Sequence, residues 1–184
     1  GPISAEYILK DPTVEFAVLE TARGGILRSG LGFSRCDIAI ITNIQEDHLG
    51  LSDIHTLEDL ARVKSTVVKS VKKDGWAILN AEDEQCLKIA NELSCNIAYF
   101  SMDENNPKVK KFSKEGKIVA VYENGFITIK KGEWKIRVER ATHVPLTMGG
   151  KAKFMIANVL AATLASYLQG FKTDDISLSL QTFI

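Results

Sequence analysis

Short apolar runs alternate with segments of helical period through about the first hundred residues of the chain. This alternation is typical of a mostly parallel sheet covered by helices. The pattern predicts strands over residues 16–20, 37–42, 76–79 and 97–100. It predicts helices over residues 4–9, 57–71 and 84–93. We therefore expect an α/β fold whose sheet is flanked by helices.

From about residue 105 to residue 145 the pattern changes to alternating apolar and polar side chains. An Asn-Gly pair at 124–125 separates two such runs, and this pair is the strongest short signal for a hairpin. The sequence thus predicts a small antiparallel meander inserted in the α/β domain. Apolar and small residues then surround most of residues 153–169, which predicts a buried helix ended by Gly170. Thr173 is expected to cap a short last helix.

A chain of 184 residues that is 45% hydrophobic and 25% charged can bury a core and fold as one domain. The 23 basic residues balance the 23 acidic ones, so the chain as a whole lacks the cationic field that non-specific nucleic-acid binding requires. No apolar run approaches the ~20 residues that cross a bilayer, and the start resembles no secretion signal. We expect a cytoplasmic protein that binds neither nucleic acid nor membrane.

The cysteines are three in number and scattered along the chain. Neither their spacing nor a nearby histidine completes a zinc site. We expect Cys36, Cys86 and Cys95 to be reduced thiols, with two or three of them buried.

Polar side chains follow the first two predicted strands. Glu20 ends the first, while Asn43, Asp47 and His48 follow the second. Ligands of open α/β sheets bind outside the carboxyl ends of the strands, so these side chains are expected along one edge. Oxygen ligands with one imidazole suit a hard ion such as Mg²⁺. On spacing alone, Glu20 could equally pair with Arg23 or cap a helix, and a lone histidine more often bonds a backbone carbonyl.

Lys64 lies on the apolar stripe of the helix predicted over 57–71, four residues after Leu60 and three before Val67. A charge there is costly unless it is paired or drawn to a ligand. Extension of the side chain along the helix towards water explains the position equally well. The chain has no GxxxxGK[ST] phosphate loop, and the glycines before Lys151 are interpreted as a lead-in to the next helix.

Three strings resemble the central domain of the Mur ligases, in the order in which that family has them. They are LETARGGILR at 19–28, TNIQEDHLGL at 42–51 and LNAED at 79–83. The first is similar to the cyanophycin synthetase branch of the family, and the resemblance covers nearly the whole chain. It implies an ATP-binding domain of the P-loop NTPase type. Both chain ends are interpreted as cuts, with the phosphate loop expected upstream and the C-terminal ligase domain downstream.

By position, the resemblance implies that Glu20 and His48 are magnesium ligands. Lys64 matches the lysine that many Mur ligases carry as a carbamate to hold a second magnesium ion, and Asn43 and Asp47 would support the same loop. Carbamylation would also explain a lysine on an apolar stripe, because it converts the cation into an anionic ligand.

The resemblance also implies contacts with the nucleotide. Asn158 matches an asparagine on the helix near the nucleotide, and Asn80 and Asp83 match an Asn-x-x-Asp turn. Capping of helices and turns explains these three residues equally well. Met155 stands where the family usually has another asparagine, which is a departure at the adenine contact.

The activity implied by the resemblance is amide-bond formation, in which ATP phosphorylates a carboxylate and an amine attacks the acyl phosphate. In the cyanophycin synthetase branch, arginine is joined to the side-chain carboxylate of an aspartate polymer. The expected cofactors are ATP and Mg²⁺, and the expected partners are an amino acid, an aspartate-containing polymer and the remaining domains of the ligase. This segment is not expected to catalyse alone. A non-catalytic binding module and a peptidoglycan or folylpolyglutamate ligase are the alternatives.

Overall fold

The structure is a computed structural model and describes residues 1–45 and 54–183. In these residues six strands form one sheet, in the order β1 to β6. The strands are β1 (Cys36–Ile41), β2 (Val71–Asn80), β3 (Asn96–Ser101), β4 (Val119–Glu123), β5 (Phe126–Lys131) and β6 (Trp134–Arg140). The pairs from β1 to β4 are parallel and those from β4 to β6 are antiparallel. The predicted α/β fold with a small antiparallel meander is confirmed.

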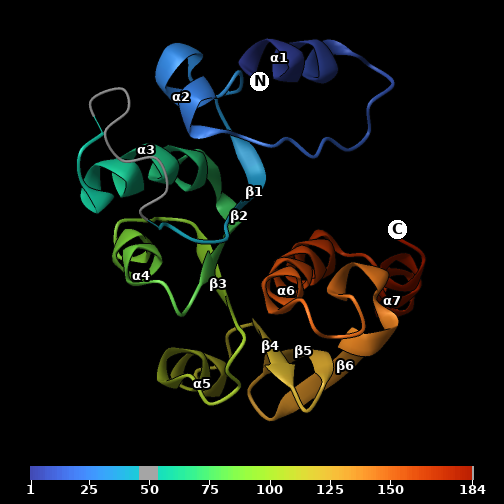
Figure 1. Cartoon of the computed structure of the whole chain (residues 1–184). Helices are drawn as coiled ribbons and strands as arrows, with labels where there is room; N and C mark the ends of the chain where they lie inside the picture. Colours follow the sequence, from blue (N-terminus) through green and yellow to red (C-terminus); the bar gives the residue numbers. More distant parts are fainter. Residues whose placement is uncertain (46–53, 184) are drawn as a thin grey trace.

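Helices cover both faces of the sheet (Figure 1). The described α-helices are α1 (Pro2–Lys10), α2 (Arg23–Ser29), α3 (Leu57–Lys69), α4 (Glu84–Ala90), α5 (Pro107–Lys114), α6 (Lys153–Gln169) and α7 (Thr173–Thr182). Of these, α3, α4 and α5 pack on one face and α6 on the other, whereas α1 packs on α2 and α2 on α3. Alternate residues of β2 divide the core, because Ala77 and Leu79 pack beneath α3 and α4 while Ile78 packs beneath α6. None of the described helices is long and apolar enough to cross a membrane.

The predicted start of α3 is confirmed in detail. The Thr56 side chain accepts from the Asp59 N–H, and the Asp59 carboxylate accepts from the Thr56 N–H, which is a capping box. Leu60, Ala61 and Val68 on the predicted stripe are buried. The helix therefore lies with its apolar stripe on the sheet.

The meander joins the main sheet directly, because β4 pairs in parallel with β3. Its first hairpin turns at Asn124 and Gly125, whose φ angles are 50° and 83°. These are the left-handed conformations that an Asn-Gly turn supplies. The α6 helix has the predicted bounds and ends at Gly170, which is also left-handed.

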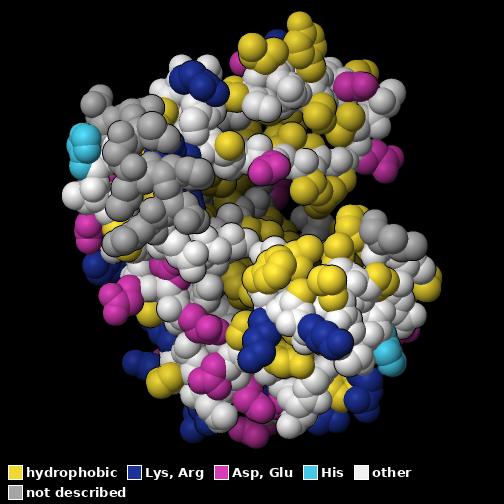
Figure 2. Space-filling model, in the orientation of Figure 1, with side chains coloured by type: hydrophobic (Ala, Val, Ile, Leu, Met, Phe, Trp, Pro, Cys, Tyr) yellow, Lys and Arg dark blue, Asp and Glu magenta, His cyan; other side chains and the backbone are white. Residues whose placement is uncertain are grey.

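The strand predicted over residues 16–20 is wrong. The segment lies outside the sheet, and in the described part of the chain β1 pairs with β2 alone. Phe16 instead packs edge-on against Phe171, with ring centroids 6.1 Å apart, and Val18 is 86% exposed. An apolar run favours burial, but a strand forms only where a neighbour pairs with its backbone groups. Apolar side chains consequently gather on the surface over α1 and over α6 (Figure 2).

Two helices were not predicted. Glycines at positions 24 and 25, which disfavour a helix, lie inside α2. The short, lysine-rich α5 begins after Asn106, whose side chain accepts from the N–H groups of Lys108 and Val109. The predicted cap at Thr173 is wrong by one position, because Thr173 is the first helical residue of α7 and Lys172 precedes it.

Candidate functional site

Three side chains converge on residues 42–44, the backbone that leaves the carboxyl end of β1. The bonds run from Asn80 Nδ2 to the Thr42 carbonyl (3.0 Å), from Lys64 Nζ to the Asn43 carbonyl (3.1 Å), and from the Ile44 N–H to Asp83 Oδ2 (2.6 Å). We call Lys64, Asn80 and Asp83 the edge cluster. The cluster brings together three residues predicted from the sequence and fixes the chain just before residues 46–53.

The turn after β2 explains how two of these side chains reach residues 42–44. Asn80 Oδ1 accepts from the Glu82 N–H at 2.9 Å, and Asp83 Oδ1 accepts from the Cys86 N–H at 3.0 Å, which caps α4. The capping interpretation is thus confirmed for Asn80 and Asp83 but not for Asn158, which lies inside α6. Each side chain uses a second polar atom for the long-range bond, so local capping and anchoring of the β1 exit are coupled.

Lys64 is half-buried on the stripe of α3, and its ammonium group donates to the Asn43 carbonyl. That bond explains how an unmodified lysine is tolerated at this position. The carbonyl satisfies one donor but does not neutralise the charge, and in the described part of the chain Lys64 forms no ion pair. The edge cluster therefore offers one cation to an anionic ligand.

The predicted magnesium site stays a prediction, because only part of it lies within the described residues. Asp47 and His48 lie outside the described residues. Glu20 is exposed in the segment that fails to form a strand, so it does not lie on a strand beside β1 as expected. Among the described residues, no group of three His, Cys, Asp or Glu side chains could hold a metal ion. The side chain of Asn43 is exposed, and only its carbonyl takes part in the cluster.

Asn158 lies apart from the edge cluster. It is exposed on α6, which covers the face of the sheet opposite to α3 and α4. Its side-chain amide is 3.8 Å from the sulfur of Met155. Met155 is the residue that stands where the family usually has another asparagine. Its role at a nucleotide stays a prediction.

The thiols are not candidate nucleophiles. All three cysteines are free, with Cys86 buried and the other two half-buried. Burial, followed by the nearby Asp83 carboxylate, raises the pKa of the Cys86 thiol to about 12. A thiol with such a pKa is protonated at neutral pH. The prediction of free thiols is confirmed, but the expectation that two or three of them are buried is wrong, because only Cys86 is buried.

Sequence reasoning missed Glu82, which orders the chain leaving β3. Its carboxylate accepts from the Ser101 hydroxyl at 2.7 Å and from the N–H groups of Met102 and Asp103. The available signal was its place inside the LNAED string, directly between Asn80 and Asp83. The turn after β2 therefore anchors the exits of both neighbouring strands.

Comparisons with known proteins agree with this architecture. The Mur ligase middle domain family matches residues 5–166. Cyanophycin synthetase of Trichormus variabilis is 52% identical over 183 residues, covering 100% of this chain and 20% of that protein. The protein of the same name from Synechocystis is 50% identical, with 100% and 21% covered. The chain thus spans about a fifth of the length of these relatives.

More distant relatives share the fold. UDP-N-acetylmuramate–L-alanine ligase of Acetivibrio thermocellus is 26% identical over 151 residues, covering 79% of this chain and 29% of that protein. MurF from Acinetobacter baumannii superposes with a TM-score of 0.56 at 19% identity, covering 80% of this chain and 29% of that chain. A sequence match across most of the chain and a shared sheet architecture agree, and the chain belongs to the Mur ligase middle domain family.

Proposed function

We propose that this domain is the ATP-binding part of an amide-bond-forming ligase that joins arginine to the side-chain carboxylates of an aspartate-containing polymer. The identity of 52% with a cyanophycin synthetase over the whole chain supports this substrate class. Identity with a UDP-N-acetylmuramate–L-alanine ligase is 26% over a shorter stretch, so a peptidoglycan substrate is less well supported. Consumption of ATP fits a cytoplasmic location.

The proposed reaction has two steps. A carboxylate oxygen of the polymer attacks the γ-phosphorus of ATP, the bond to the β-phosphate oxygen breaks, and ADP leaves with an acyl phosphate formed. The arginine amine then attacks the acyl carbon, inorganic phosphate leaves, and the amine loses a proton as the amide forms. Bound Mg²⁺ would supply charge neutralisation of the phosphates.

The edge cluster is the structural observation that supports a ligand-binding site at the carboxyl end of β1. It fixes residues 42–44, which directly precede the segment containing His48, by three bonds from side chains of α3 and the turn after β2. Rigid support of this kind is what a ligand-bearing segment requires. Asn80 and Asp83 act as positioning residues in this proposal, and the charge of Lys64 is available to phosphate oxygens.

The ligands proposed for Mg²⁺ are His48 and Glu20, and the residue proposed for the nucleotide is Asn158. A carbamate on Lys64 would replace the ammonium cation with an anionic group that keeps one N–H on Nζ, so the charge beside the Asn43 carbonyl would change sign. The unmodified and the carbamylated lysine thus differ in charge, and mass measurement of the intact protein distinguishes them.

Exchange of this chain into a related enzyme tests the function. The equivalent stretch of the Trichormus variabilis cyanophycin synthetase is replaced by this chain, and incorporation of labelled arginine into an aspartate polymer is measured with ATP and Mg²⁺. We expect ATP-dependent incorporation and matched release of ADP and phosphate. A chimera that elutes as a folded species and gives neither product would contradict the proposal.

A further inference from the structure

Charge is distributed unevenly along a chain whose basic and acidic residues balance. Residues 105–145 hold ten Lys and Arg but four Glu and no Asp. These residues form α5 and the meander β4 to β6, at the end of the sheet farthest from β1. The excess of positive charge is therefore concentrated at one end of the molecule.

Two of the four glutamates are buried, so their carboxylates are not exposed on this surface. Glu123 is 4% exposed, and its carboxylate lies 2.6 Å from Lys130 Nζ and 3.1 Å from Lys135 Nζ. Glu139 is 8% exposed and accepts hydrogen bonds from Ser177 of α7 and from the N–H of Arg140, the last residue of β6. Lys130 and Lys135 therefore already bind one carboxylate, that of Glu123, in the meander.

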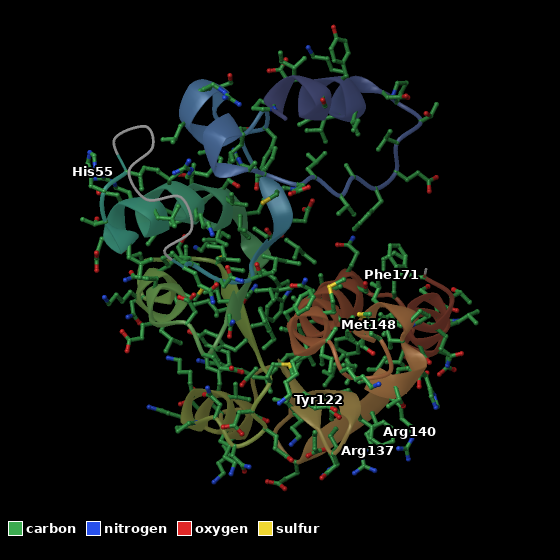
Figure 3. All side chains as sticks on the ribbon, viewed as in Figure 1. His55, Tyr122, Arg137, Arg140, Met148 and Phe171 are labelled. Carbon is green, nitrogen blue, oxygen red and sulfur yellow. The ribbon has the colours of Figure 1, made fainter. Side chains whose placement is uncertain are left out.

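Two arginines of β6 extend the positive surface around one aromatic ring. The guanidinium carbons of Arg137 and Arg140 lie 5.0 Å and 4.4 Å from the ring centroid of Phe126. Both point outward from β6, away from α6 (Figure 3). Stacking on a ring holds a guanidinium group while leaving its N–H groups able to bind carboxylates, and Arg137 Nε lies 4.0 Å from the Glu123 carboxylate. We call Phe126, Lys130, Lys135, Arg137 and Arg140 the basic face.

The neighbouring helix α5 adds further cations. Lys110, Lys111 and Lys114 are exposed, and no carboxylate lies within 4.0 Å of them in the part of the chain that the structure describes. Arg140 likewise forms no ion pair among the described residues. Lys130, Lys135 and Arg137 share the single carboxylate of Glu123, so three cations of the basic face lie around one negative charge. Arg140 and the three α5 lysines add cations that no described carboxylate matches.

We infer that the basic face is a docking surface for an acidic polypeptide chain, whose side-chain carboxylates bind Arg137 and Arg140. Glu123 provides the precedent for a carboxylate among these cations. Single-stranded nucleic acid binds by stacking its bases on open aromatic rings, whereas guanidinium groups lie against the ring of Phe126. A carboxylate-rich chain fits the free donors better than stacked bases do.

This inference deepens the proposed function and rests on it for the identity of the chain, which would be the aspartate-containing polymer. Five strand spacings of ~4.8 Å separate β1 from β6, so the basic face lies on the order of 24 Å from the edge cluster across the sheet. An extended peptide covers ~3.4 Å per residue. A polymer longer than about seven residues would therefore reach from the basic face to the edge cluster.

Fluorescence anisotropy of labelled aspartate oligomers tests docking without ATP or Mg²⁺, so the result is independent of ligation. We expect an oligomer of about twelve residues, chosen to exceed the span of the sheet, to bind the 184-residue chain. The double variant Arg137→Gln/Arg140→Gln should weaken binding at least ~10-fold, because both carboxylate contacts are lost. The control Arg28→Gln/Lys172→Gln removes the same charge elsewhere and should leave affinity within about twofold. Equal weakening by both pairs, or no weakening, would overturn the inference.

Two further probes identify the ligand class. Arg137→Lys/Arg140→Lys keeps the charge and should restore part of the affinity. An oligothymidylate of matched length and vesicles containing phosphatidylserine serve as competing anions. Tighter binding of either one, lost in the Gln double variant, would assign the surface to nucleic acid or lipid and overturn the inference. Unchanged thermal midpoints of all variants establish that each one is folded.

Discussion

At the residue scale, Asp83 joins two elements through one carboxylate. Its oxygens accept from the Ile44 N–H and from the N–H of Cys86 at the start of α4. Asp83→Ala leaves both donors without this partner, and we expect a loss of about 1–3 kcal/mol in the free energy of unfolding. Urea denaturation measures this loss. Asp11→Ala, which removes a carboxylate bonded to Thr13 in an exposed turn, is the control and should change little.

The residues of the edge cluster were predicted, but their contacts were not. Local spacing identified Asn80 and Asp83 as capping residues, and their bonds to Glu82 and Cys86 agree. Their partners in residues 42–44 lie 38 and 39 positions away along the chain. Such bonds depend on the pairing of β1 with β2. The spacing of apolar residues along the chain does not specify which strands pair. The partner of Lys64 was missed for the same reason.

At the scale of elements, Glu139 holds α7 against the end of β6. Its carboxylate accepts from Ser177 and Gln181 of α7, from the Arg140 N–H and from the His143 ring. Burial by itself raises the pKa of Glu139, but these hydrogen bonds outweigh burial and lower the pKa from 4.5 to about 2. The ionised carboxylate therefore stabilises the docked helix.

The depressed pKa predicts acid sensitivity of this attachment. A carboxyl group whose pKa is lower in the folded state contributes its full stability above the unfolded pKa, here 4.5, and loses it as the pH falls towards about 2. We expect Glu139→Gln to destabilise the chain at neutral pH by on the order of 3 kcal/mol. The difference between wild type and variant should shrink between these two pH values. Denaturation at a series of pH values measures it, and a constant difference would contradict the assignment.

The hydrophobic pattern predicted helices and turns best where an apolar segment was long or where a distinctive turn sequence was present. The bounds of α6 and the turn at 124–125 were predicted, because a nearly continuous apolar helix and an Asn-Gly pair each have few alternatives. The segment 16–20 failed because an apolar run does not specify its pairing partner. The glycines of α2 and the lysines of α5 concealed two short helices whose ends are set by tertiary contacts and by Asn106.

At the scale of the whole molecule, net charge concealed the distribution of charge. Balanced totals predicted no cationic field, yet residues 105–145, which form α5 and the meander, hold ten Lys and Arg against four Glu. The edge cluster and the basic face lie at opposite ends of one sheet. A long anionic polymer could contact both, and the sheet would then set the distance between its docked and its reacting parts.

The central claim places the reaction at the edge cluster, and substitution of Lys64 in the ligase chimera tests it most directly. Lys64→Met removes the cation and the bond to the Asn43 carbonyl, whereas Lys69→Met on the same helix removes an exposed cation paired with Glu92 at 2.7 Å. We expect Lys64→Met to lower the rate of arginine incorporation by at least ~100-fold, as for loss of a group that stabilises the transferring phosphoryl charge. Lys69→Met should keep nearly full activity. Equal activity of the two folded variants would contradict the claim.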